Sequence, residues 1–503
     1  MDSYKLEFTD YLKTDSNEVK LREKLKGVSK GTPTYKKISK QLNDLQMENR
    51  GVSFDLEGKA YVHNLTFAKY CLSRLKIIKV QDTTYIYNRK YHHYENIALD
   101  DIGSILMRIM GELKEEYYRI FKEGELLSII LRKVDAYKKL ELTSGAIVMN
   151  NGVFYIENQH FHSKFSMKII NLSSVSYDYN PQATCPRFND FLNDIFDHNQ
   201  QLIRLIQQIF GYTFCYGEVR IHKLFYWLGC GRNGKGVLTK ILQLLHGEEN
   251  VSSLFLDDLT ARFNASALVG KVLNISPEGK QSKVLDTAMI KSLTAGDSVM
   301  VEKKYHDPYS TNLSTKFIVC SNYPLLTDDD SNGFLSRLVP IPFNKVYHER
   351  PLDGKLKEGI QYQDPYLFDK LKEELPGIFN WCMEGLSDLQ NNNWTLATCK
   401  EVDELRQRYA LQSKPVRLFF KSCISNTSGE LNIKSSEVHL AFKTWSKVNN
   451  IPTFGYEKSA EFHEEFRKVL ELENLKSATK LKNGYEYYYG IHLREDYRNS
   501  IIY

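Results

Sequence analysis

The sequence predicts an α/β protein built around a parallel sheet, and three observations lead to this prediction. The apolar run 224–228 precedes a glycine-rich stretch, GCGRNGK, and a helical pattern follows it to about Leu245. Residues 220–345 then alternate between strand-like and helix-like segments, which is typical of a parallel sheet covered on both faces. The sequence before this part mixes helical and strand patterns, and residues 415–503 follow with three helical patterns and a hairpin.

Composition indicates an ordinary globular protein of several domains. The chain has 503 residues, of which 42% are hydrophobic and 26% are charged. No apolar run approaches the length of a membrane span, and the first residues, MDSYKLEFTDYLKTD, lack the apolar core of a signal peptide, so we expect a cytoplasmic protein without membrane contact. The 8 cysteines are scattered without a C-x-x-C pair, which favours reduced core thiols. A net charge of +5 means that contacts with nucleic acid must come from local basic patches.

The N-terminal region predicts a helix pair followed by a hairpin and further helices. Residues 1–60 contain the lysine-rich stretch KLREKLKGVSKGTPTYKKISKQL with few apolar positions. Both a DNA-binding face and a solvated charged surface fit this stretch. Residues 74–94 alternate like a β-hairpin that turns near Gln81, and the pattern from 99 to 142 is helical. We expect four parts: a basic α+β region at 1–130, a helical collar at 131–215, a motor domain at 216–408 and a C-terminal domain at 409–503.

The glycine-rich stretch is typical of a phosphate-binding loop. Glycines let backbone N–H groups turn around an anion, and the N-terminus of the following helix adds partial positive charge. Lys235 would reach the terminal phosphates of a nucleoside triphosphate. Gly236 stands where a Ser or Thr hydroxyl usually meets magnesium, and Thr239 one turn later is a weak substitute. We therefore expect the chain to bind a nucleoside triphosphate.

Two later strands end in polar side chains that suit phosphoryl transfer. The apolar segment VLNI leads to Glu278, and the segment KFIVCS leads to Asn322. Carboxyl ends of strands are where α/β sheets place ligand-binding residues, so Glu278 can hold hydrated Mg²⁺ and orient the attacking water. Glu278 has no second acidic neighbour in the sequence. The amide of Asn322 can contact a γ-phosphate, or it can cap a turn before Pro324.

Arg337 lies inside the apolar segment GFLSRLVPIPF. An arginine in such a segment usually has an acidic partner. It can pair internally, or it can reach the phosphate of a neighbouring subunit as an arginine finger. The second alternative requires a ring or a filament.

Five segments in order resemble the motifs of superfamily III helicases: GCGRNGKGVL, LVGKVLNISPE, IKSLTAGDSVMVEKKY, KFIVCSNYPL and FLSRLVPIPF. The branch they resemble is that of the poxvirus-type primase–helicases and the replication proteins of satellite phages and plasmids. The resemblance implies an AAA+ motor that uses ATP and Mg²⁺ as cofactors and forms a hexameric ring. This ring would move 3′ to 5′ on single-stranded DNA and unwind forked DNA. It implies host replication proteins as possible partners.

The resemblance also assigns roles by position. Nucleotide contacts fall on Gly229, Gly231, Arg232, Asn233, Gly234, Lys235, Gly236 and Val237. Lys235, Glu278, Asn322 and Arg337 are the expected catalytic residues, with Glu278 at the metal. A hairpin after residue 297 would enter the ring channel, with Lys303, Lys304 and His306 contacting DNA.

The C-terminal pattern of three helices and a hairpin at Asn483 and Gly484 predicts a winged helix. Lys480 and Lys482 of the wing can contact duplex DNA, but the third helix carries Glu461, Glu464 and Glu465, which phosphates repel. Two alternatives stay open for this domain: sequence-specific binding to an origin, and protein packing or non-specific contact.

The sequence as a whole predicts a replicative DNA helicase of a mobile element or virus, and two alternatives stay open. One is an ATP-switched origin-binding or assembly protein that does not unwind DNA, which the glycine at 236 and the lone Glu278 would suit. The other adds primase chemistry at the N-terminus, where Asp55 and Glu57 offer an acidic pair without a third acid.

Overall fold

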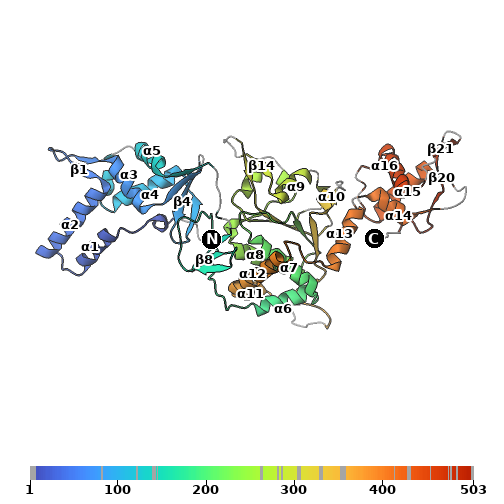
Figure 1. Cartoon of the computed structure of the whole chain (residues 1–503), viewed down its shortest axis with the longest axis horizontal. Coiled ribbons are helices and arrows are strands. Elements are labelled where there is room, and N and C mark those ends of the chain that lie inside the picture. Colours follow the sequence, from blue (N-terminus) through green and yellow to red (C-terminus); the bar gives the residue numbers. More distant parts are fainter. Residues whose placement is uncertain are drawn as a thin grey trace. The chain divides into compact units, whose positions relative to one another are not determined.

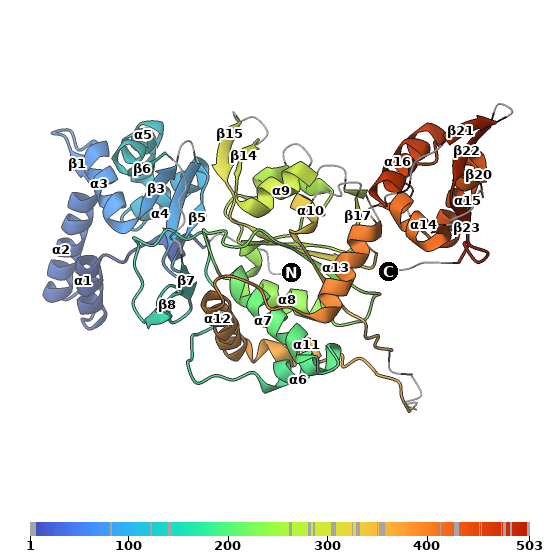
Figure 2. The same cartoon turned by 45° about the vertical axis from the view of Figure 1, so that its right-hand side comes forward.

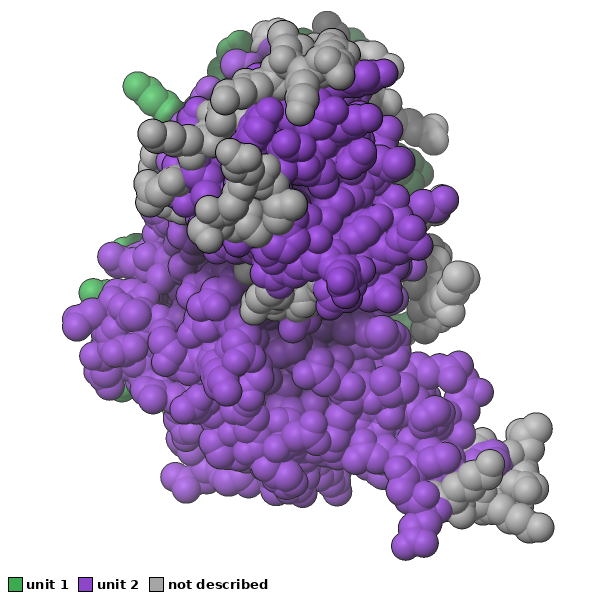
Figure 3. Space-filling view, turned by 90° about the vertical axis from the view of Figure 1, so that its right-hand side faces the viewer, with its two compact units in different colours: residues 1–180 green, residues 181–503 purple. Residues whose placement is uncertain are grey.

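The computed structural model divides into two compact units, residues 1–180 and residues 181–503 (Figures 1 and 3). It describes residues 7–499 except 81–82, 121–122, 139–142, 144, 261–263, 280–282, 285–286, 303–307, 324, 328–331, 350, 352–357, 413, 427–431, 452, 454, 474, 476–478 and 483–484. Within the described part, every helix is too short or too polar to span a bilayer.

The first unit packs helices on a small sheet. Its elements are η1 (Phe8–Tyr11), α1 (Ser16–Lys26), α2 (Pro33–Arg50), β1 (Val52–Phe54), β2 (Ala60–Val62), α3 (Asn64–Arg74), β3 (Ile77–Val80), β4 (Thr83–Asn88), β5 (His93–Asn96), α4 (Leu99–Gly111), η2 (Glu115–Ile120), α5 (Glu123–Lys133), β6 (Asp135–Tyr137), β7 (Ala146–Met149), β8 (Gly152–Tyr155) and β9 (His160–His162). The sheet order is β5-β4-β3-β6, with β6 parallel to β3. Phe67, Ile105 and Ile130 from three helices share a core with Ile77 and Ile86 of the sheet.

The helix pair expected near the N-terminus is present as α1 and α2, which lie side by side in Figures 1 and 2. The hairpin expected at 74–94 is also confirmed, because β3 and β4 pair antiparallel. Its turn residues lie outside the described residues. The helical expectation is wrong at Asp135–Tyr137, which forms the edge strand β6. The free edge of β3 supplies hydrogen-bond partners to this segment. The residue pattern within the segment cannot reveal this pairing, because the partner strand lies elsewhere in the sequence.

A buried ion-pair network fixes α1 and α2 to the rest of the first unit. The Arg50 side chain is fully buried and donates to Glu18 Oε1 at 2.7 Å and to Glu112 Oε2 at 2.6 Å. Gln46 donates to Glu18 Oε2 at 3.0 Å, and Tyr70 donates to Glu18 Oε1 at 2.9 Å. Burial alone would raise the pKa of the Glu18 carboxyl, but the hydrogen bond and charge of Arg50 outweigh burial and lower this pKa to about 2.

The second unit is centred on a five-stranded parallel sheet with the order β11-β12-β16-β10-β18. These strands are β11 (Val251–Ser252), β12 (Leu273–Ser276), β16 (Lys316–Ser321), β10 (Leu224–Leu228) and β18 (Leu338–Pro342). All neighbouring pairs in this sheet are parallel. The parallel sheet predicted from the alternating pattern is thus confirmed.

Helices cover both faces of this sheet. Phe225 and Trp227 point to one face, where they contact the rings of Tyr212 and Phe210. Tyr226 points to the other face and packs edge-on against Tyr409. Figure 2 shows α7 (Gln200–Thr213), α8 (Lys235–His246) and α12 (Leu375–Asn391) on one side, and α9 (Thr287–Ala295) and α10 (Asn332–Leu335) on the other.

The amino-terminal edge of the sheet is held by a buried lysine. Lys316 opens β16 with 3% exposure, and its ammonium donates to the carbonyl oxygens of Glu218 at 2.6 Å, Ser314 at 2.9 Å and Cys215. Burial lowers the pKa of Lys316 to about 8. The loop after α7 is thereby tied to the central strands.

The C-terminal part repeats the predicted order of three helices and a hairpin. The helices are α14 (Pro415–Cys423), α15 (Ser435–Val448) and α16 (Ser459–Leu472), and the hairpin strands are β21 (Thr479–Lys482) and β22 (Tyr485–Tyr489). Trp445 and Phe462 are fully buried between the helices.

The remaining elements of the second unit are α6 (Pro186–Ile195), η3 (Glu248–Asn250), η4 (Asp258–Thr260), η5 (Asn264–Leu268), β13 (Lys283–Val284), β14 (Ser298–Val301), β15 (Tyr309–Asn312), β17 (Leu326–Thr327), α11 (Leu367–Lys372), α13 (Lys400–Gln412), β19 (Ile424–Asn426), β20 (Asn432–Lys434) and β23 (Ile491–Leu493).

The Glu18 network gives the first unit a specific acid sensitivity. The pKa of Glu18 is lowered from 4.5 to about 2 on folding, so its carboxylate stabilises the fold above pH 4.5 and this contribution is lost as the pH falls towards 2. Between pH 7 and pH 3 we expect about 2 kcal/mol of this stability to be lost in the wild type and not in Glu18→Gln. Hydrogen exchange of peptides from α1 and α2, corrected for intrinsic rate, measures it. Glu23→Gln, an exposed site on the same helix, is the control; equal pH dependence in both variants would contradict the role of Glu18.

Candidate functional site

Three neighbouring strands bring the predicted site residues to one edge of the parallel sheet. β10 leads into the glycine loop (residues 229–234), β12 leads to Glu278 and β16 leads to Asn322. Because β12, β16 and β10 are adjacent and parallel, their carboxyl ends lie together. This edge is where α/β sheets bind ligands.

Lys235, Glu278 and Asn322 contact one another and form a polar triad. The Lys235 ammonium lies 3.2 Å from Glu278 Oε1 and donates to Asn322 Oδ1 at 3.3 Å. Asn322 Nδ2 donates to Glu278 Oε2 at 3.2 Å. Lys235 also donates to the carbonyl of Gly229, so its three N–H groups all have acceptors. The Lys235 side chain is 2% exposed and that of Glu278 is 44% exposed, so the carboxylate is the member of the triad that can move into solvent.

The glycine loop presents free backbone donors beside the triad. Within the described part of the chain, nothing accepts a hydrogen bond from the N–H groups of residues 230–234. Gly234 has φ of 89°, a left-handed conformation that glycine adopts without strain, and it directly precedes α8. Free N–H groups, a helix N-terminus and a buried ammonium together make a cradle for an anion of phosphate type.

Asn233 holds this loop in place. It is 3% exposed, its Nδ2 donates to the carbonyl of Phe343 at 3.4 Å, and its Oδ1 accepts from the Lys235 N–H at 3.4 Å. Gly229 allows the same close approach, because a Cβ there would lie 2.2 Å from the Phe343 carbonyl oxygen. The loop is therefore pinned to the end of β18 as well as to β10.

The other residues predicted to contact the nucleotide lie at the outer side of the glycine loop or in the first turn of α8. Arg232 is exposed and pairs with Glu349 at 2.7 Å, Val237 is half-buried, and Gly231 and Gly236 are exposed. A Cβ at Gly236 would meet open space. The Thr239 hydroxyl donates to the Gly236 carbonyl at 3.1 Å and so is engaged within its own helix.

Arg337 lies away from the triad. It directly precedes β18, and its carbonyl accepts from the Leu224 N–H at 2.8 Å, which places it at the amino-terminal edge of the sheet. Its Nη1 donates to the Gly333 carbonyl, and its buried Nε has no partner. Among the described residues no carboxylate pairs with it. The internal ion pair considered from the sequence is thus missing from the part of the chain that is described.

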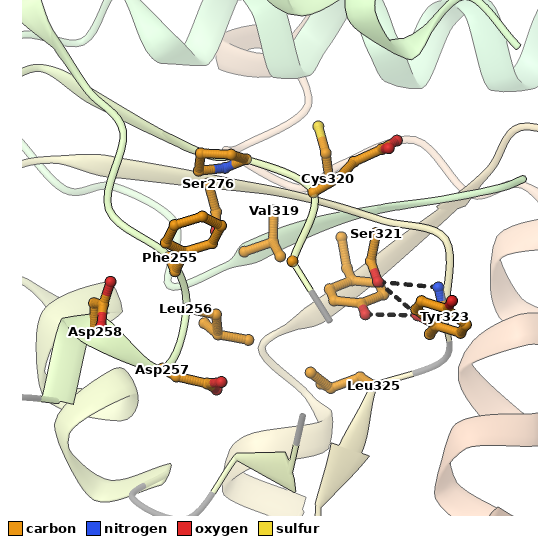
Figure 4. A pocket seen from close by; sticks show the side chains of 14 residues that line it. Phe255, Leu256, Asp257, Asp258, Ser276, Val319, Cys320, Ser321, Tyr323 and Leu325 are labelled. Carbon is orange, nitrogen blue, oxygen red and sulfur yellow. Dashed lines mark hydrogen bonds between the residues drawn. The ribbon is translucent and has the colours of Figure 1, made fainter. Parts of the chain in front are cut away.

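A cavity of about 440 Å³ opens beside Glu278 and brings in acidic residues that the sequence did not single out. Its lining includes Asp257 and Asp258 together with Phe255 and Tyr323 (Figure 4). The Tyr226 hydroxyl donates to the Tyr323 carbonyl at 2.7 Å and closes one wall. The signal in the sequence was an acid pair after the short strand β11, which lies next to β12 in the sheet.

The predicted DNA contacts are only partly described. Lys303, Lys304 and His306 lie outside the described residues, between β14 and β15, which pair antiparallel as the expected hairpin. Lys480 and Lys482 lie on β21, opposite Tyr487 and Tyr485 of β22.

Two family models match the chain. Residues 109–197 match a family described as D5 N terminal like, and residues 227–337 match a family of unknown function, DUF5906. The second match runs from the end of β10 to Arg337 and includes the whole polar triad.

Curated relatives come from viruses and a virophage. C962R of African swine fever virus, which carries the name of a primase, is 22% identical over 386 residues, 72% of this chain and 40% of that protein. L207/L206 of Acanthamoeba polyphaga mimivirus, named a helicase, is 25% identical over 48% of this chain and 26% of its own length. V13 of Sputnik virophage, also named a helicase, is 22% identical over 62% of this chain and 41% of its own length. The chain thus spans about two-fifths or less of the length of these relatives.

Solved structures of the NrS-1 C-terminal region are also similar. One apo structure of residues 305–718 has a TM-score of 0.49 at 14% identity and covers 85% of this chain and 99% of that chain. Another apo form has a TM-score of 0.47 at 12% identity.

The geometry of the glycine loop predicts opposite effects for two alanine substitutions. Gly229→Ala forces a Cβ against the Phe343 carbonyl, and we expect it to destabilise the second unit by about 2 kcal/mol. Gly236→Ala meets open space in the first turn of α8 and should keep or raise stability, by up to about 1 kcal/mol. Thermal unfolding followed by tryptophan fluorescence measures both, since Trp227 is buried directly before the loop. Equal melting temperatures for the two variants would contradict the prediction.

Proposed function

We propose that this chain, a relative of the primase–helicases of viruses and mobile elements, is an ATP-driven DNA helicase that acts in replication. The observation that carries the proposal is the polar triad beside the free N–H groups of the glycine loop. The names of the mimivirus and virophage relatives support the choice of a helicase over other nucleotide-binding functions.

In this proposal the triad performs ATP hydrolysis. The glycine loop and Lys235 would bind the β- and γ-phosphates, and Glu278 would hold Mg²⁺ and orient the attacking water. Asn322 contacts the γ-phosphate or that water. Entry of the phosphates separates Lys235 from Glu278, so nucleotide binding releases the carboxylate that the reaction needs. Gly236 provides no hydroxyl for Mg²⁺, so Glu278 would be the residue that holds the ion, which would neutralise charge on the phosphates.

The position of Arg337 supports action on a neighbouring subunit. The five residues of β10 separate the two edges of the sheet by about 15 Å, too far for Arg337 to reach phosphates in its own loop. A guanidinium without an acidic partner among the described residues is suited to a phosphate on another copy of the chain. We propose an AAA+ type ring of six subunits, as in superfamily III, that moves 3′ to 5′ on single-stranded DNA, with a winged helix in residues 409–503.

A second candidate is an ATP-dependent switch that assembles on DNA without unwinding it. The closed Lys235–Glu278 ion pair favours it, because a catalytic carboxylate held by the lysine slows hydrolysis until the pair opens. Strand displacement on a forked DNA decides between the two. The contacts of Asp55 weaken the case for primase chemistry at this residue. Its carboxylate accepts hydrogen bonds from the N–H groups of Glu57 and Lys59 and from the Tyr61 hydroxyl, so Asp55 caps a turn.

The triad predicts different defects for its two charged members. Lys235→Ala should lower ATP affinity more than tenfold, because the buried cation for the phosphates is lost. Glu278→Gln should bind ATP at least as well as wild type, because the competing carboxylate is gone, and should hydrolyse it about 10²–10³ times more slowly. Fluorescent-nucleotide binding and phosphate release, with and without single-stranded DNA, measure these effects. Lys240→Ala, an exposed lysine on α8, is the control; wild-type hydrolysis by Glu278→Gln would refute the assignment.

A trans-acting Arg337 predicts complementation between two inactive variants. Arg337→Ala alone should bind ATP but lose most hydrolysis. Mixed equally with Lys235→Ala, it should recover up to about a quarter of wild-type activity, because one interface in four then joins an intact loop to an intact arginine. Arg406→Ala is the control, since Arg406 pairs with Asp403 at 2.7 Å. Absence of recovery in rings that do form mixed assemblies would exclude the trans role.

A further inference from the structure

The tips of α1 and α2 form a strongly basic surface, which we call the basic hairpin (residues 20–40). It contains eight basic side chains and one acidic one, Glu23. The basic residues are Lys20, Arg22, Lys24, Lys26, Lys30, Lys36, Lys37 and Lys40. Seven positive charges in this short segment are therefore unbalanced, in a chain whose net charge is only +5.

These charges face solvent and are almost free of partners. All eight basic side chains are exposed. Arg22 lies 4.0 Å from Glu18, and within the described residues none of the seven lysines forms an ion pair. Charges placed this densely repel one another, so the surface favours a polyanion as its ligand.

The basic hairpin presents these charges in fixed rows. Lys20 and Lys24 are four residues apart on α1, as are Lys36 and Lys40 on α2, which sets each pair about 6 Å apart along its helix. Thr32 caps α2 by accepting from the Tyr35 N–H at 3.1 Å, and the buried Arg50–Glu18 pair anchors the base of the two helices. The two helices lie alongside each other in both views (Figures 1 and 2).

The uncharged side chains of the basic hairpin narrow the choice of partner. No large hydrophobic side chain is exposed among residues 16–50, all of which are described; the Val, Leu, Ile and Tyr side chains between 19 and 45 are half-buried. Membrane-surface helices need an exposed apolar face, and stable protein interfaces need an apolar core, so both partners fit poorly. Single-stranded DNA is bound mainly by aromatic stacking, and Tyr35, the one tyrosine among these residues, is half-buried. Duplex DNA needs only cations along its phosphates.

We propose that the basic hairpin binds the phosphate backbone of duplex DNA without sequence choice. This contact is separate from the nucleotide site and independent of ATP. It gives the first unit a role of its own, which is to hold duplex DNA while the second unit works on it. The sequence alone left this segment open between a DNA-binding face and a solvated surface, and the exposure and lack of partners favour binding.

The test is the salt dependence of duplex binding by the full chain without nucleotide. The variant Lys24→Gln, Lys26→Gln, Lys36→Gln, Lys37→Gln removes four charges and keeps good helix formers. The control variant Lys69→Gln, Lys133→Gln, Lys164→Gln, Lys168→Gln removes the same charge from exposed lysines elsewhere in the first unit. Fluorescence anisotropy with labelled duplex DNA, single-stranded DNA and vesicles containing anionic lipid provides the comparison, and circular dichroism verifies the helices.

We expect the hairpin variant to lose at least tenfold in duplex affinity at 0.1 M salt, and the slope of log K against log salt to become shallower by about 2 to 4, since each lost phosphate contact contributes about 0.9. The control variant should change less than twofold, and basal ATP hydrolysis should be equal in both variants, which separates this proposal from that of the motor. Equal duplex affinities for the two variants would overturn it. So would a loss confined to single-stranded DNA or to vesicles.

Discussion

The parallel registration of β12, β16 and β10 is the constraint on which the candidate site depends. Parallel strands need long crossover connections, so residues far apart in sequence can end at the same edge. Glu278 and Lys235 are 43 positions apart in the printed sequence and yet their side chains meet at 3.2 Å. Lys316 holds the opposite edge through three carbonyl oxygens. A buried lysine thus lies at each end of the sheet. Lys316 is held by neutral carbonyl oxygens, and Lys235 is paired with the partly exposed carboxylate of Glu278.

Lys316 and Lys235 differ in the charge of their partners, and this difference bears on function. Lys316 donates to three neutral carbonyl oxygens, and its ammonium lies 5.5 Å from the centroid of the Tyr212 ring. Lys235 has the partly exposed Glu278, which water can take over when an anion replaces it at the ammonium. The Glu278 carboxylate is the charged partner of the buried Lys235 ammonium, so exchange of this carboxylate for another anion keeps the cation paired. In the proposed function, the triad would exchange its carboxylate for a phosphate, and this exchange would link nucleotide binding to the release of Glu278.

The sequence predicted those parts of the fold and site that depend on local order along the chain. The glycine loop between a strand and a helix, and the three helices before β21 and β22, follow from patterns within short segments. It failed at Asp135–Tyr137, which is a strand only because β3 has a free edge. Asp257 and Asp258 were missed for the same reason, since their place beside Glu278 follows from the packing of β11 against β12. No local pattern in a single sequence shows which distant segments pair with each other.

In the first unit, buried charges and exposed charges have different roles. Its buried charges are paired: Arg50 contacts Glu18 and Glu112, and Arg74 also contacts Glu112. The lysines of the basic hairpin are exposed, and Glu18 at the base of the two helices is already paired with the buried Arg50. Repulsion among these lysines acts against the helix pair, and the buried network opposes that repulsion. A duplex bound across residues 20–40 would remove the repulsion at its source, so DNA binding and the stability of α1 and α2 are thermodynamically linked, and each strengthens the other.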